Sequence, residues 1–318
     1  MLQHQRLINR AESQGMTVTD VSQMMQRDAA IITHNDKSEL VIDGVPMSWL
    51  TVSSQFYCDN KQLTKLAYEA VNIPYPKSII FDSPNEKAVI DFFKNGQLYI
   101  CKPLDSTNGI GVELGIDTLE KVNLYYDNYK YLNTRFLLEE YAEGKDLRIQ
   151  VIGGKIVAAC IREPAFVTGN GKNTVKELMD IRQVIMTSQN PNNRLEVDEA
   201  TEELLKEQKL TLNDIPKENR HVQLKYVSNI AQGGLPIDVT DEIHVDFHRW
   251  AKDLSTYLGT SYMGLDFMTT THTENPHLCT KVLEINARAD WVHHTFSEVR
   301  THDIAGIILE HLFNWNYD

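Results

Sequence analysis

Cysteine is scarce in this sequence of 318 residues. The four cysteines, Cys58, Cys101, Cys160 and Cys279, are far apart and form no Cys-x-x-Cys pair. Disulfide-rich secreted domains and small zinc-binding domains both need a denser set of cysteines. We therefore interpret these side chains as reduced structural thiols, in preference to disulfide partners or zinc ligands.

Basic residues and long apolar runs are also in short supply. Lysine and arginine number 31 against 44 aspartates and glutamates, which gives a formal charge of −13. Nucleic-acid binding and anionic membrane surfaces call for a basic patch, so we expect neither partner, whereas a locally complemented small anion such as ATP is compatible with this charge. Residues 1–6 lack the apolar core of a signal peptide, and no run approaches the roughly 20 apolar residues of a membrane helix. These absences predict a cytoplasmic protein.

What the sequence does contain is the composition of a soluble globular protein. Hydrophobic residues make up 42% and charged residues 24%, in a chain long enough for two or three lobes. Residues 1–55 are expected to form a short N-terminal α/β unit. It would hold a polar helix near residues 3–14 and strands at 29–33 and 40–42, joined by an Asn-Asp-Lys turn.

The remaining pattern alternates helices with short strands. A helix is expected over about residues 59–71, with Leu63, Leu66, Ala67, Ala70 and Val71 at helical spacing and an Ile-Pro-Tyr-Pro stop after it. Short strands are expected at 78–81, 98–102, 136–141, 147–152 and 156–161, with a hairpin turn at 153–155 between the last two. The charged, helix-rich interval 175–217 is interpreted as an insertion. Amphipathic helices at 242–258 and 301–313 follow it.

Oxygen-bearing side chains at the ends of two apolar strands suggest a metal site. In a strand of period two, Glu284 and Asn286 point to one face, while Leu283 and Ile285 point to the other. Asp266, in an apolar run upstream, would complete the set from a neighbouring strand. Mg²⁺ prefers such hard oxygen ligands and bridges them to substrate phosphates, so the cluster predicts a nucleotide site. The alternative is a strand with two solvated polar residues.

A glycine-rich segment precedes this cluster in the chain. Residues 102–112 read Lys-Pro-Leu-Asp-Ser-Thr-Asn-Gly-Ile-Gly-Val and are flanked by two strands. Backbone N–H groups in such loops bind anions. The segment matches neither the P-loop nor the dinucleotide fingerprint, because no helix opens after it. Lys102 at the strand end would place an ammonium group beside the phosphates; a glycine-rich hairpin without a ligand is the alternative.

Taken in order, these motifs resemble the ATP-grasp family of carboxylate–amine ligases. The resemblance rests on the glycine-rich segment, on Leu-Glu-Glu-Tyr-Ala-Glu-Gly-Lys-Asp-Leu-Arg at 138–148 and on Glu-Ile-Asn at 284–286. Within the family, the runs at 162–178, 228–234 and 238–241 are similar to the ATP-grasp module of cyanophycin synthetase and of bifunctional glutathione synthetase. The similarity spans about residues 59–313. This sequence contains neither a Mur-ligase-like domain nor a glutamate–cysteine ligase domain.

The resemblance implies an α+β fold of the ATP-grasp type, in which two α+β lobes clasp ATP. The domain after the short N-terminal unit would then cover residues 56–318. Its small lobe would run over about 56–142 and include the glycine-rich loop. Its large lobe would run over about 143–318 and include the insertion near 175–217.

The resemblance also implies roles for individual residues. Those that would contact the phosphates are Lys65, Lys102 and the loop residues Ser106, Thr107, Asn108, Gly109 and Gly111. Glu139, Glu140 and Ala142 would line the adenine, and Asp146 would bind the ribose. Asp266, Glu284 and Asn286 match the ligands of Mg²⁺, with two ions expected and Mn²⁺ as a substitute. Arg148, Arg162, Asn229, Gly233 and Gly234 would face the acyl phosphate and the substrates.

The implied reaction is ATP-dependent formation of an amide or peptide bond. ATP would phosphorylate a carboxylate, and an amine would attack the acyl phosphate, with release of ADP and phosphate; positioning and charge neutralisation would supply most of the catalysis. An amino acid or small peptide is the expected substrate, and a homodimer is considered. The alternatives are a non-catalytic ATP-binding or regulatory module and a ligase acting on a polyamine or a protein terminus.

Departures from the family pattern cluster on the presumed acceptor side. The chain has Gly-Asn-Gly at 169–171 for Gly-Asp-Gly and Ala-Gln-Gly-Gly at 231–234 for Ser-Thr-Gly-Gly. After Asn286, the usual Pro-Gly is replaced by Ala-Arg-Ala-Asp-Trp. Arg288 in this run could bind a substrate carboxylate, or simply pair with Asp290, and the family has a histidine near His294. ATP chemistry is therefore better supported than the identity of the substrates.

Overall fold

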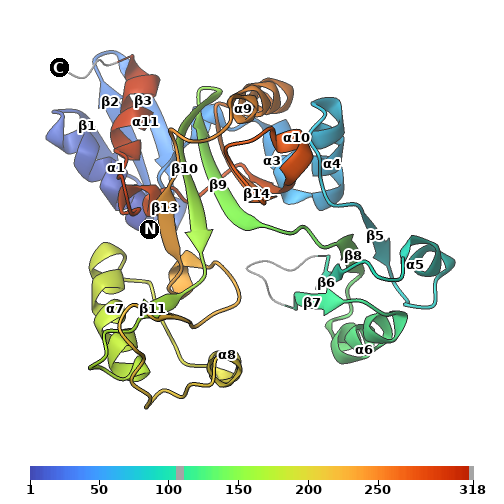
Figure 1. Cartoon of the computed structure of the whole chain (residues 1–318). Coiled ribbons are helices and arrows are strands. Elements are labelled where there is room, and N and C mark those ends of the chain that lie inside the picture. The colour runs from blue at the N-terminus through green and yellow to red at the C-terminus, as the bar shows by residue number, and fades with distance from the viewer. Residues whose placement is uncertain (105–110, 315–318) are drawn as a thin grey trace.

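A five-stranded sheet runs through the middle of the molecule, and two smaller units extend from the same side of it (Figure 1). This computed structural model describes residues 1–104 and 111–314. Within those two ranges, the helices are all too short or too polar to cross a bilayer.

The N-terminal unit is an antiparallel sheet covered by one helix. Its strands follow the order β1-β2-β3-β4, and α1 packs against α11 from the other end of the chain. Its elements are α1 (Leu2–Ser13), β1 (Thr17–Asp20), α2 (Ser22–Met25), β2 (Ala29–His34), β3 (Lys37–Ile42), β4 (Val45–Pro46) and η1 (Met47–Trp49), and α11 covers Ile304–Phe313. The expected helix and two strands are confirmed, whereas β1 and β4 were not expected from the sequence. Asn35 has a φ of 51° in the turn between β2 and β3.

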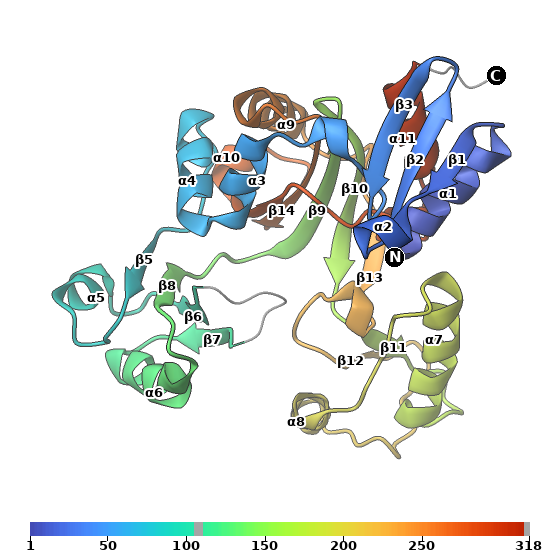
Figure 2. The ribbon, with the colours of Figure 1, turned by 180° about the vertical axis from the view of Figure 1, so that it is seen from behind.

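The helix expected over about 59–71 is confirmed as α4 (Lys61–Ala70), whereas the helix before it, α3 (Val52–Asp59), was not expected. Asn60 separates the two helices, and its side chain accepts hydrogen bonds from the first free N–H groups of α4. Of the apolar residues at helical spacing, Ala67 is buried together with Tyr68, whereas Leu63 and Leu66 are exposed. Seen from behind, α3 and α4 lie at one end of the central sheet and the N-terminal unit lies at the other (Figure 2).

One of the smaller units is a four-stranded antiparallel sheet with two helices. Its strand order is β5-β8-β6-β7, and aromatic and aliphatic side chains fill the space under the helices. Its elements are β5 (Ser78–Phe81), α5 (Lys87–Phe92), β6 (Tyr99–Pro103), β7 (Glu113–Ile116), α6 (Leu119–Tyr129), η2 (Lys130–Leu132) and β8 (Phe136–Glu140). Tyr99 and Cys101 point into this core. By strand alternation Lys102 therefore lies on the opposite face.

The central sheet has the order β13-β10-β9-β14-β15 and is antiparallel throughout. Its strands and associated helices are β9 (Lys145–Ile152), β10 (Lys155–Glu163), β13 (Leu235–Asp238), α9 (Val245–Leu258), β14 (Tyr262–Thr269), α10 (Pro276–Cys279), β15 (Thr280–Asn286) and η4 (Val292–Thr295). The hairpin expected between β9 and β10 is confirmed, with φ of 60° at Gly153 and 71° at Gly154. One face of the sheet packs on α4 and α9 through side chains such as Leu147, Leu265 and Phe267. The other face is polar where it carries the charged side chains described below, whereas Ile152, Ala158 and Tyr262 on it pack into a second apolar core with α1 and α11.

The strict alternation expected along β15 is wrong at one residue. Asp266 pairs with Glu284, but the next residue of β14, Phe267, pairs with Val282, so Leu283 forms a β-bulge. Leu283 is 42% exposed, whereas Val282 and Ile285 are fully buried. The bulge keeps both of these apolar side chains in the core while Glu284 stays opposite Asp266.

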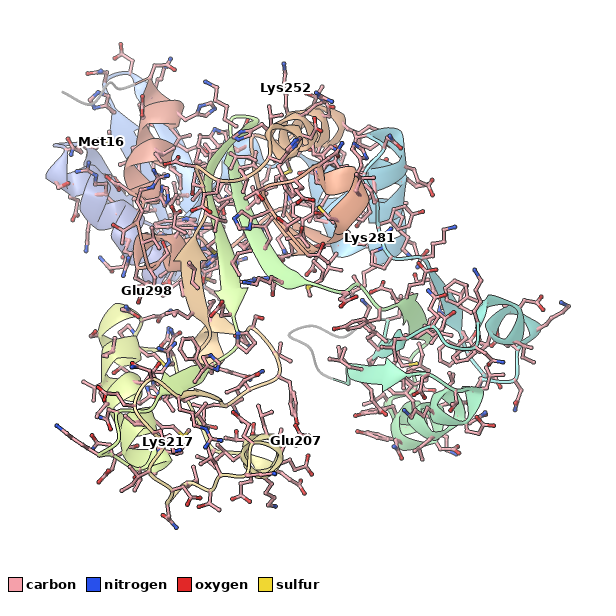
Figure 3. The ribbon with its side chains drawn as sticks, viewed as in Figure 1. Met16, Glu207, Lys217, Lys252, Lys281 and Glu298 are labelled. Carbon is pink, nitrogen blue, oxygen red and sulfur yellow. The ribbon has the colours of Figure 1, made fainter. Side chains whose placement is uncertain are left out.

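The second smaller unit corresponds to the expected insertion and has its own apolar core. Its elements are β11 (Phe166–Thr168), α7 (Val175–Gln189), α8 (Glu199–Glu207), β12 (His221–Gln223) and η3 (Ile230–Gln232). Glu298, labelled in Figure 3, lies where this unit meets the body: its backbone bonds to Pro236 and Asp238 of β13. The division into domains and lobes at the residues given above stays a prediction.

Candidate active site

A row of charged side chains crosses the polar face of the central sheet. Arg148 on β9 lies directly opposite Asp266 on β14, which lies opposite Glu284 on β15. Nη1 of Arg148 donates to both carboxylate oxygens of Asp266 at 2.8 Å. Arg148 and Asp266 are only 5% and 7% exposed. The register of three strands therefore builds a buried ion pair beside an exposed glutamate.

A second arginine extends this row to the neighbouring strand. Arg162 on β10 lies opposite Asp146 on β9, and its Nε and Nη2 donate to Oδ1 of Asp146 at 3.0 and 2.6 Å. Nη2 also donates to Oδ1 of Asp266 at 2.9 Å. The two arginines and two aspartates thus form one network, in which each charge is compensated.

Asn286 and Gly264 complete the face on the other side of Asp266. Nδ2 of Asn286 donates to Oδ2 of Asp266 at 2.9 Å. Gly264 lies opposite Asn286 in the register, and a Cβ at this position would lie 2.5 Å from Cβ of Ala289 and 2.7 Å from Nη2 of Arg148. The absence of a side chain at Gly264 therefore lets the guanidinium group of Arg148 lie over the strand.

Charge and burial shift the titration of these carboxyl groups in different directions. Burial favours protonation of Asp266, but Arg148 and Arg162 outweigh it and hold the pKa of Asp266 below its usual value. Burial raises the pKa of Asp146 even though Arg162 opposes the shift. Desolvation by the surrounding protein also raises the pKa of Glu284, although its side chain reaches solvent, and the charge of Asp266 adds to the shift.

The residues predicted to bind the nucleotide lie on α4, on the smaller sheet and at the junction of that sheet with β9. Nζ of Lys102 forms an ion pair of 2.7 Å with Glu139, and Nζ of Lys65 donates to the hydroxyl of Ser78. Desolvation lowers the pKa of Lys65, and the nearby charge of Lys102 lowers it further while Glu139 opposes the shift. The structure therefore brings both predicted phosphate-binding lysines to one place around Glu139.

The connection from β8 to β9 contains the residues predicted to line the adenine. The side chain of Glu140 accepts from the backbone N–H of Lys77 at 3.2 Å, and Ala142 is buried. Gly144 has a φ of 133°, and a Cβ there would lie 2.3 Å from the backbone oxygen of Thr269. This close approach fixes the path of the chain between the smaller sheet and the central sheet.

The turn containing Asn229, Gly233 and Gly234 leads directly into β13. The side chain of Asn229 accepts from the N–H of Ala231, so this oxygen holds the turn itself. Gly233 has a φ of 102°, and Gly234 approaches the backbone oxygens of Asn229 and Glu163 too closely for a side chain. The turn thus lies beside the end of β10, because Leu235, which follows Gly234, pairs with Glu163, the neighbour of Arg162.

Other predicted residues are not part of this assembly. Ser106, Thr107, Asn108 and Gly109 lie outside the described residues, whereas Gly111 has a φ of 71° and its carbonyl accepts from the hydroxyl of Tyr125. Nη2 of Arg288 donates to the side chain of Gln55 on α3 at 3.4 Å, and no contact with Asp290 is found among the described residues. His294 is fully buried below the face.

Sequence reasoning missed two contributors to this region. Nζ of Lys61 donates to the backbone oxygen of Leu104 at 3.2 Å, and its charge acts on Glu284. Lys61 could have been noticed in the sequence, because it directly follows Asn60 and is therefore the first residue of α4. Cys160 lies opposite Arg148 in the register of β10 and β9, and nothing in the spacing of the cysteines pointed to it.

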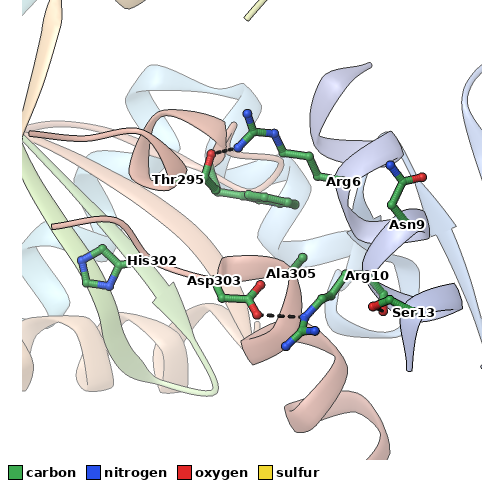
Figure 4. Close-up of a pocket in the computed structure, with 9 residues that line it drawn as sticks. Arg6, Asn9, Arg10, Ser13, Thr295, His302, Asp303 and Ala305 are labelled. Carbon is green, nitrogen blue, oxygen red and sulfur yellow. Dashed lines mark hydrogen bonds and ion pairs between the residues drawn. The ribbon is translucent and has the colours of Figure 1, made fainter. Parts of the chain in front are cut away.

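An open pocket lies elsewhere on the molecule. It has a volume of about 400 Å³ and lies between α1 and the start of α11, as Figure 4 shows. Arg6 donates to Thr295 and Arg10 pairs with Asp303 at 2.8 Å, so the arginines of this cavity already have protein partners. The charged row of the central sheet stays the predicted site, because it, unlike the cavity, contains residues predicted to bind Mg²⁺ and to face the acyl phosphate.

Comparison with known proteins shows what this chain is similar to. No family model matches the chain. The cyanophycin synthetase of Nostoc sp. is 29% identical over 268 residues, which cover 80% of this chain and 29% of that protein. The glutathione biosynthesis bifunctional protein of Pasteurella multocida is 28% identical over 246 residues, which cover 74% of this chain and 32% of that protein. The chain therefore spans less than a third of these curated relatives.

A solved structure extends the likeness to nearly the whole chain. The crystal structure of the bifunctional glutathione synthetase from Pasteurella multocida superposes with a TM-score of 0.77 at 24% sequence identity, over 98% of this chain and 44% of that chain. The resemblance to the ATP-grasp modules of cyanophycin synthetase and bifunctional glutathione synthetase is thus confirmed. The α+β fold of the ATP-grasp type is confirmed as well.

Proposed function

We propose that this chain is an ATP-dependent ligase that joins a carboxylate to an amine through an acyl phosphate. The observation that carries the proposal is the charged row of Arg148, Asp266 and Glu284 across three adjoining strands. It places guanidinium groups next to oxygen donors that suit Mg²⁺, which is the combination that phosphoryl transfer requires. The ATP-grasp fold and the relatives named above support the same reaction class.

The residues present fit a magnesium ion. Asn286 donates its Nδ2 to Asp266 and so keeps its amide oxygen for a cation, while the carboxylate of Glu284 reaches solvent. Asp266 receives guanidinium and amide donors on both oxygens. Glu284, Asn286 and, once an arginine turns away, Asp266 would hold the ion. Mg²⁺ would supply neutralisation of the phosphate charges.

The arginines would act on the transferred phosphoryl group. A guanidinium binds phosphate with the same planar fork that it offers to a carboxylate. Arg162, which shares its donors between Asp146 and Asp266, can therefore exchange part of these contacts for phosphoryl oxygens. The negative charge of Asp266 would meanwhile keep Arg148 aligned. In this role the protein positions charges and needs no covalent nucleophile.

The smaller sheet would bind the nucleotide. Lys102 is held by its ion pair with Glu139 and Lys65, from α4, by its hydrogen bond to Ser78, so both ammonium groups are oriented before a phosphate arrives. Glu140 and Ala142 in the connection to β9 would line the adenine. Both bonds from Arg162 end on Oδ1 of Asp146, which leaves its Oδ2 for a ribose hydroxyl. The glycine-rich loop is proposed to cover the phosphates.

The acyl donor is proposed to be an amino acid or a small peptide. A screen of ADP release over pairs of amino acids and dipeptides, with product masses determined by mass spectrometry, tests this directly. We expect ADP to form only when both a carboxylate and an amine are supplied, and one product to carry the mass of their condensation. ADP release that is independent of any added acceptor, with no condensed product, would contradict the proposal.

A second candidate is a non-catalytic ATP-binding or regulatory module. The observation that favours it is the occupation of Asp266 by two arginines, which leaves one predicted metal ligand engaged within the protein. This candidate predicts saturable binding of Mg-ATP with no ADP formed under any substrate pair. A polyamine or a protein terminus as the amine would appear in the same screen as an acceptor. The cytoplasmic location and the homodimer expected from the sequence stay predictions.

A further inference from the structure

Three side chains with metal-binding atoms meet in the interior behind the charged row. Cys160 comes from β10, and His293 and His294 are adjacent in η4. One ligand atom from each of them lies within 4.8 Å of the others. Cys160 and His294 are fully buried, and His293 is 6% exposed. The fold thus brings together residues that are more than 130 positions apart in the sequence.

The imidazole groups in this cluster lack hydrogen-bond partners. Within the described ranges, three ring nitrogens have no hydrogen-bond partner: Nδ1 and Nε2 of His294, and Nε2 of His293. Buried polar atoms in proteins are nearly always satisfied, because leaving them unpaired costs free energy. The two rings lie with their centroids 4.2 Å apart, so their nitrogens share a small volume. Burial lowers the pKa of both histidines well below the usual value, which keeps the neutral, metal-binding form.

The backbone holds these rings in place from both sides. The N–H of His294 donates to Trp291, and its carbonyl accepts from the N–H of His302 at 2.9 Å. The N–H of Phe296 donates to the carbonyl of His293. Because the peptide groups are used, the side-chain nitrogens are the atoms left without a partner. A metal ion, which accepts electron pairs, is a ligand that the unprotonated nitrogens of these rings can bind.

The donor set matches a borderline transition metal. One thiolate and two imidazoles suit Zn²⁺, whose bonds are about 2.3 Å to sulfur and about 2.0 to 2.1 Å to nitrogen. Tetrahedral donors are then about 3.3 to 3.6 Å apart. Since the three atoms lie within 4.8 Å of one another, side-chain rotation has to draw them together by no more than roughly 1.5 Å. A water molecule can supply the fourth position.

We propose that Cys160, His293 and His294 form a binding site for a divalent transition metal of the Zn²⁺ class. Sγ of Cys160 would bind as a thiolate, and its thiol proton would be released to solvent on metal binding. The ion would join η4 to β10, the strand that also carries Arg162. This site is separate from the Mg²⁺ residues and does not depend on the proposed ligase activity. It also revises the sequence-based interpretation of Cys160 as a merely structural thiol.

Titration with Co²⁺ tests the site in the full chain. Cobalt in a tetrahedral thiolate site gives intense thiolate-to-metal absorption and visible ligand-field bands. We expect both to appear and to saturate at one ion per chain, and Zn²⁺ to abolish them at the same stoichiometry. To exclude the two partly exposed thiols, the titration uses a background in which Cys58→Ser and Cys279→Ser leave only the two buried cysteines.

Cys101 provides a matched control. It is fully buried like Cys160, and burial raises the pKa of both thiols to about 12. In that background, Cys160→Ser should abolish the cobalt–thiolate absorption and weaken Zn²⁺ binding by at least about 100-fold, since even outer partners of metal ligands cost ~10- to 100-fold. His294→Gln should weaken binding similarly. Cys101→Ser should keep both signals.

A second readout keeps the test informative if a variant folds poorly. Zn²⁺ that binds the native state should raise the melting temperature of the unaltered chain, and this rise should be lost with Cys160→Ser or His293→Gln. Absence of cobalt–thiolate absorption in the unaltered chain would overturn the proposal without any variant. Unchanged affinity in Cys160→Ser would overturn it too, because the ion would then be bound by other residues.

Discussion

Arg148 and Asp266 face each other across β9 and β14, and one guanidinium nitrogen donates to both carboxylate oxygens at 2.8 Å. Both side chains are nearly buried. A buried pair of this kind costs desolvation free energy that is recovered only while both partners are present. The sheet face that carries the candidate site is therefore stable only while both Arg148 and Asp266 are present.

Asp266→Asn tests that dependence. It removes the charge but little volume, and it leaves the buried guanidinium of Arg148 without a compensating carboxylate. We expect the free energy of unfolding to fall by about 3 kcal/mol, measured by urea denaturation. The matched control is Asp241→Asn, which breaks the exposed ion pair with Arg300 and should cost less than about 1 kcal/mol. Equal losses in the two variants would show that Arg148 does not depend on Asp266.

Gly264→Ala tests the close packing above β14. The added methyl group would collide with Ala289 and with the guanidinium of Arg148. We expect the variant to lose about 2 kcal/mol or more of stability, because neither the strand nor the buried arginine has room to move. Gly96→Ala is the comparison: its methyl meets no atom, and its positive φ costs only about 1 kcal/mol. Melting temperatures that fall equally would contradict this account of Gly264.

The insertion unit offers a prediction about pH. Asp198 caps α8 and pairs with the buried Lys225 at 2.6 Å. Burial opposes ionisation, but hydrogen bonds from Lys225 and Thr201 outweigh it and lower the pKa of Asp198 to about 2, against an ordinary value of 3.8. The folded-state pKa is depressed, so the stabilisation is complete above pH ~4 and disappears as the pH falls through about 2.

Asp198→Asn isolates this charge, because asparagine caps a helix about as well as aspartate. Asp198 is half exposed, so after allowance for solvent screening we expect a loss of only about 1 kcal/mol at pH 7. The difference from the unaltered chain should shrink between pH 4 and pH 2. Hydrogen exchange of the amides in α8 measures it locally. A difference that stays constant down to pH 2 would mean that Lys225 is stabilised by other groups.

Arg162→Lys tests the proposed contact with the phosphoryl group. Lysine keeps the charge but cannot reach Asp146 and Asp266 with a planar fork. We expect kcat/KM for ligation to fall about 100-fold, which corresponds to roughly 2.7 kcal/mol of transition-state stabilisation, while the Kd for ATP changes less than about threefold. Arg249→Lys, an exposed arginine on α9, is the control. Parallel losses of ATP affinity and turnover would place Arg162 in nucleotide binding instead.

Local chemistry explains which parts of the fold were predictable from the sequence. The two consecutive glycines between apolar strands predict the hairpin at residues 153–154. The helical spacing of apolar residues in α9 and α11 predicts which face of each helix is buried. The helix α3 was missed, although Thr51, which caps it, is a residue type that begins helices. The bulge at Leu283 could not be foreseen, because it results from pairing with β14 and not from the residues of β15 alone.

In the candidate site, too, the residues marked by local sequence were predictable and the contacts made by tertiary structure were not. Asp266, Glu284 and Asn286 were recognisable because short-range alternation and a family motif mark them. The ion pairs of Asp266 with Arg148 and Arg162 could not be recognised, since they depend on the register between β14 and β9, which are more than 100 residues apart in the chain. The meeting of Cys160 with two histidines is likewise a product of the fold. Side chains joined only by tertiary structure leave no spacing signal in the sequence.

The measurement that tests the central claim most directly is ADP formation by Glu284→Gln. The charge of this exposed carboxylate is proposed to hold Mg²⁺ at the phosphates, and no packed side chain is lost by the change. We predict unchanged unfolding by urea, with ADP formation reduced at least about 1,000-fold, or roughly 4 kcal/mol. Glu274→Gln, in the exposed connection between β14 and β15, should be fully active. Normal Mg²⁺-dependent turnover by Glu284→Gln would contradict the account.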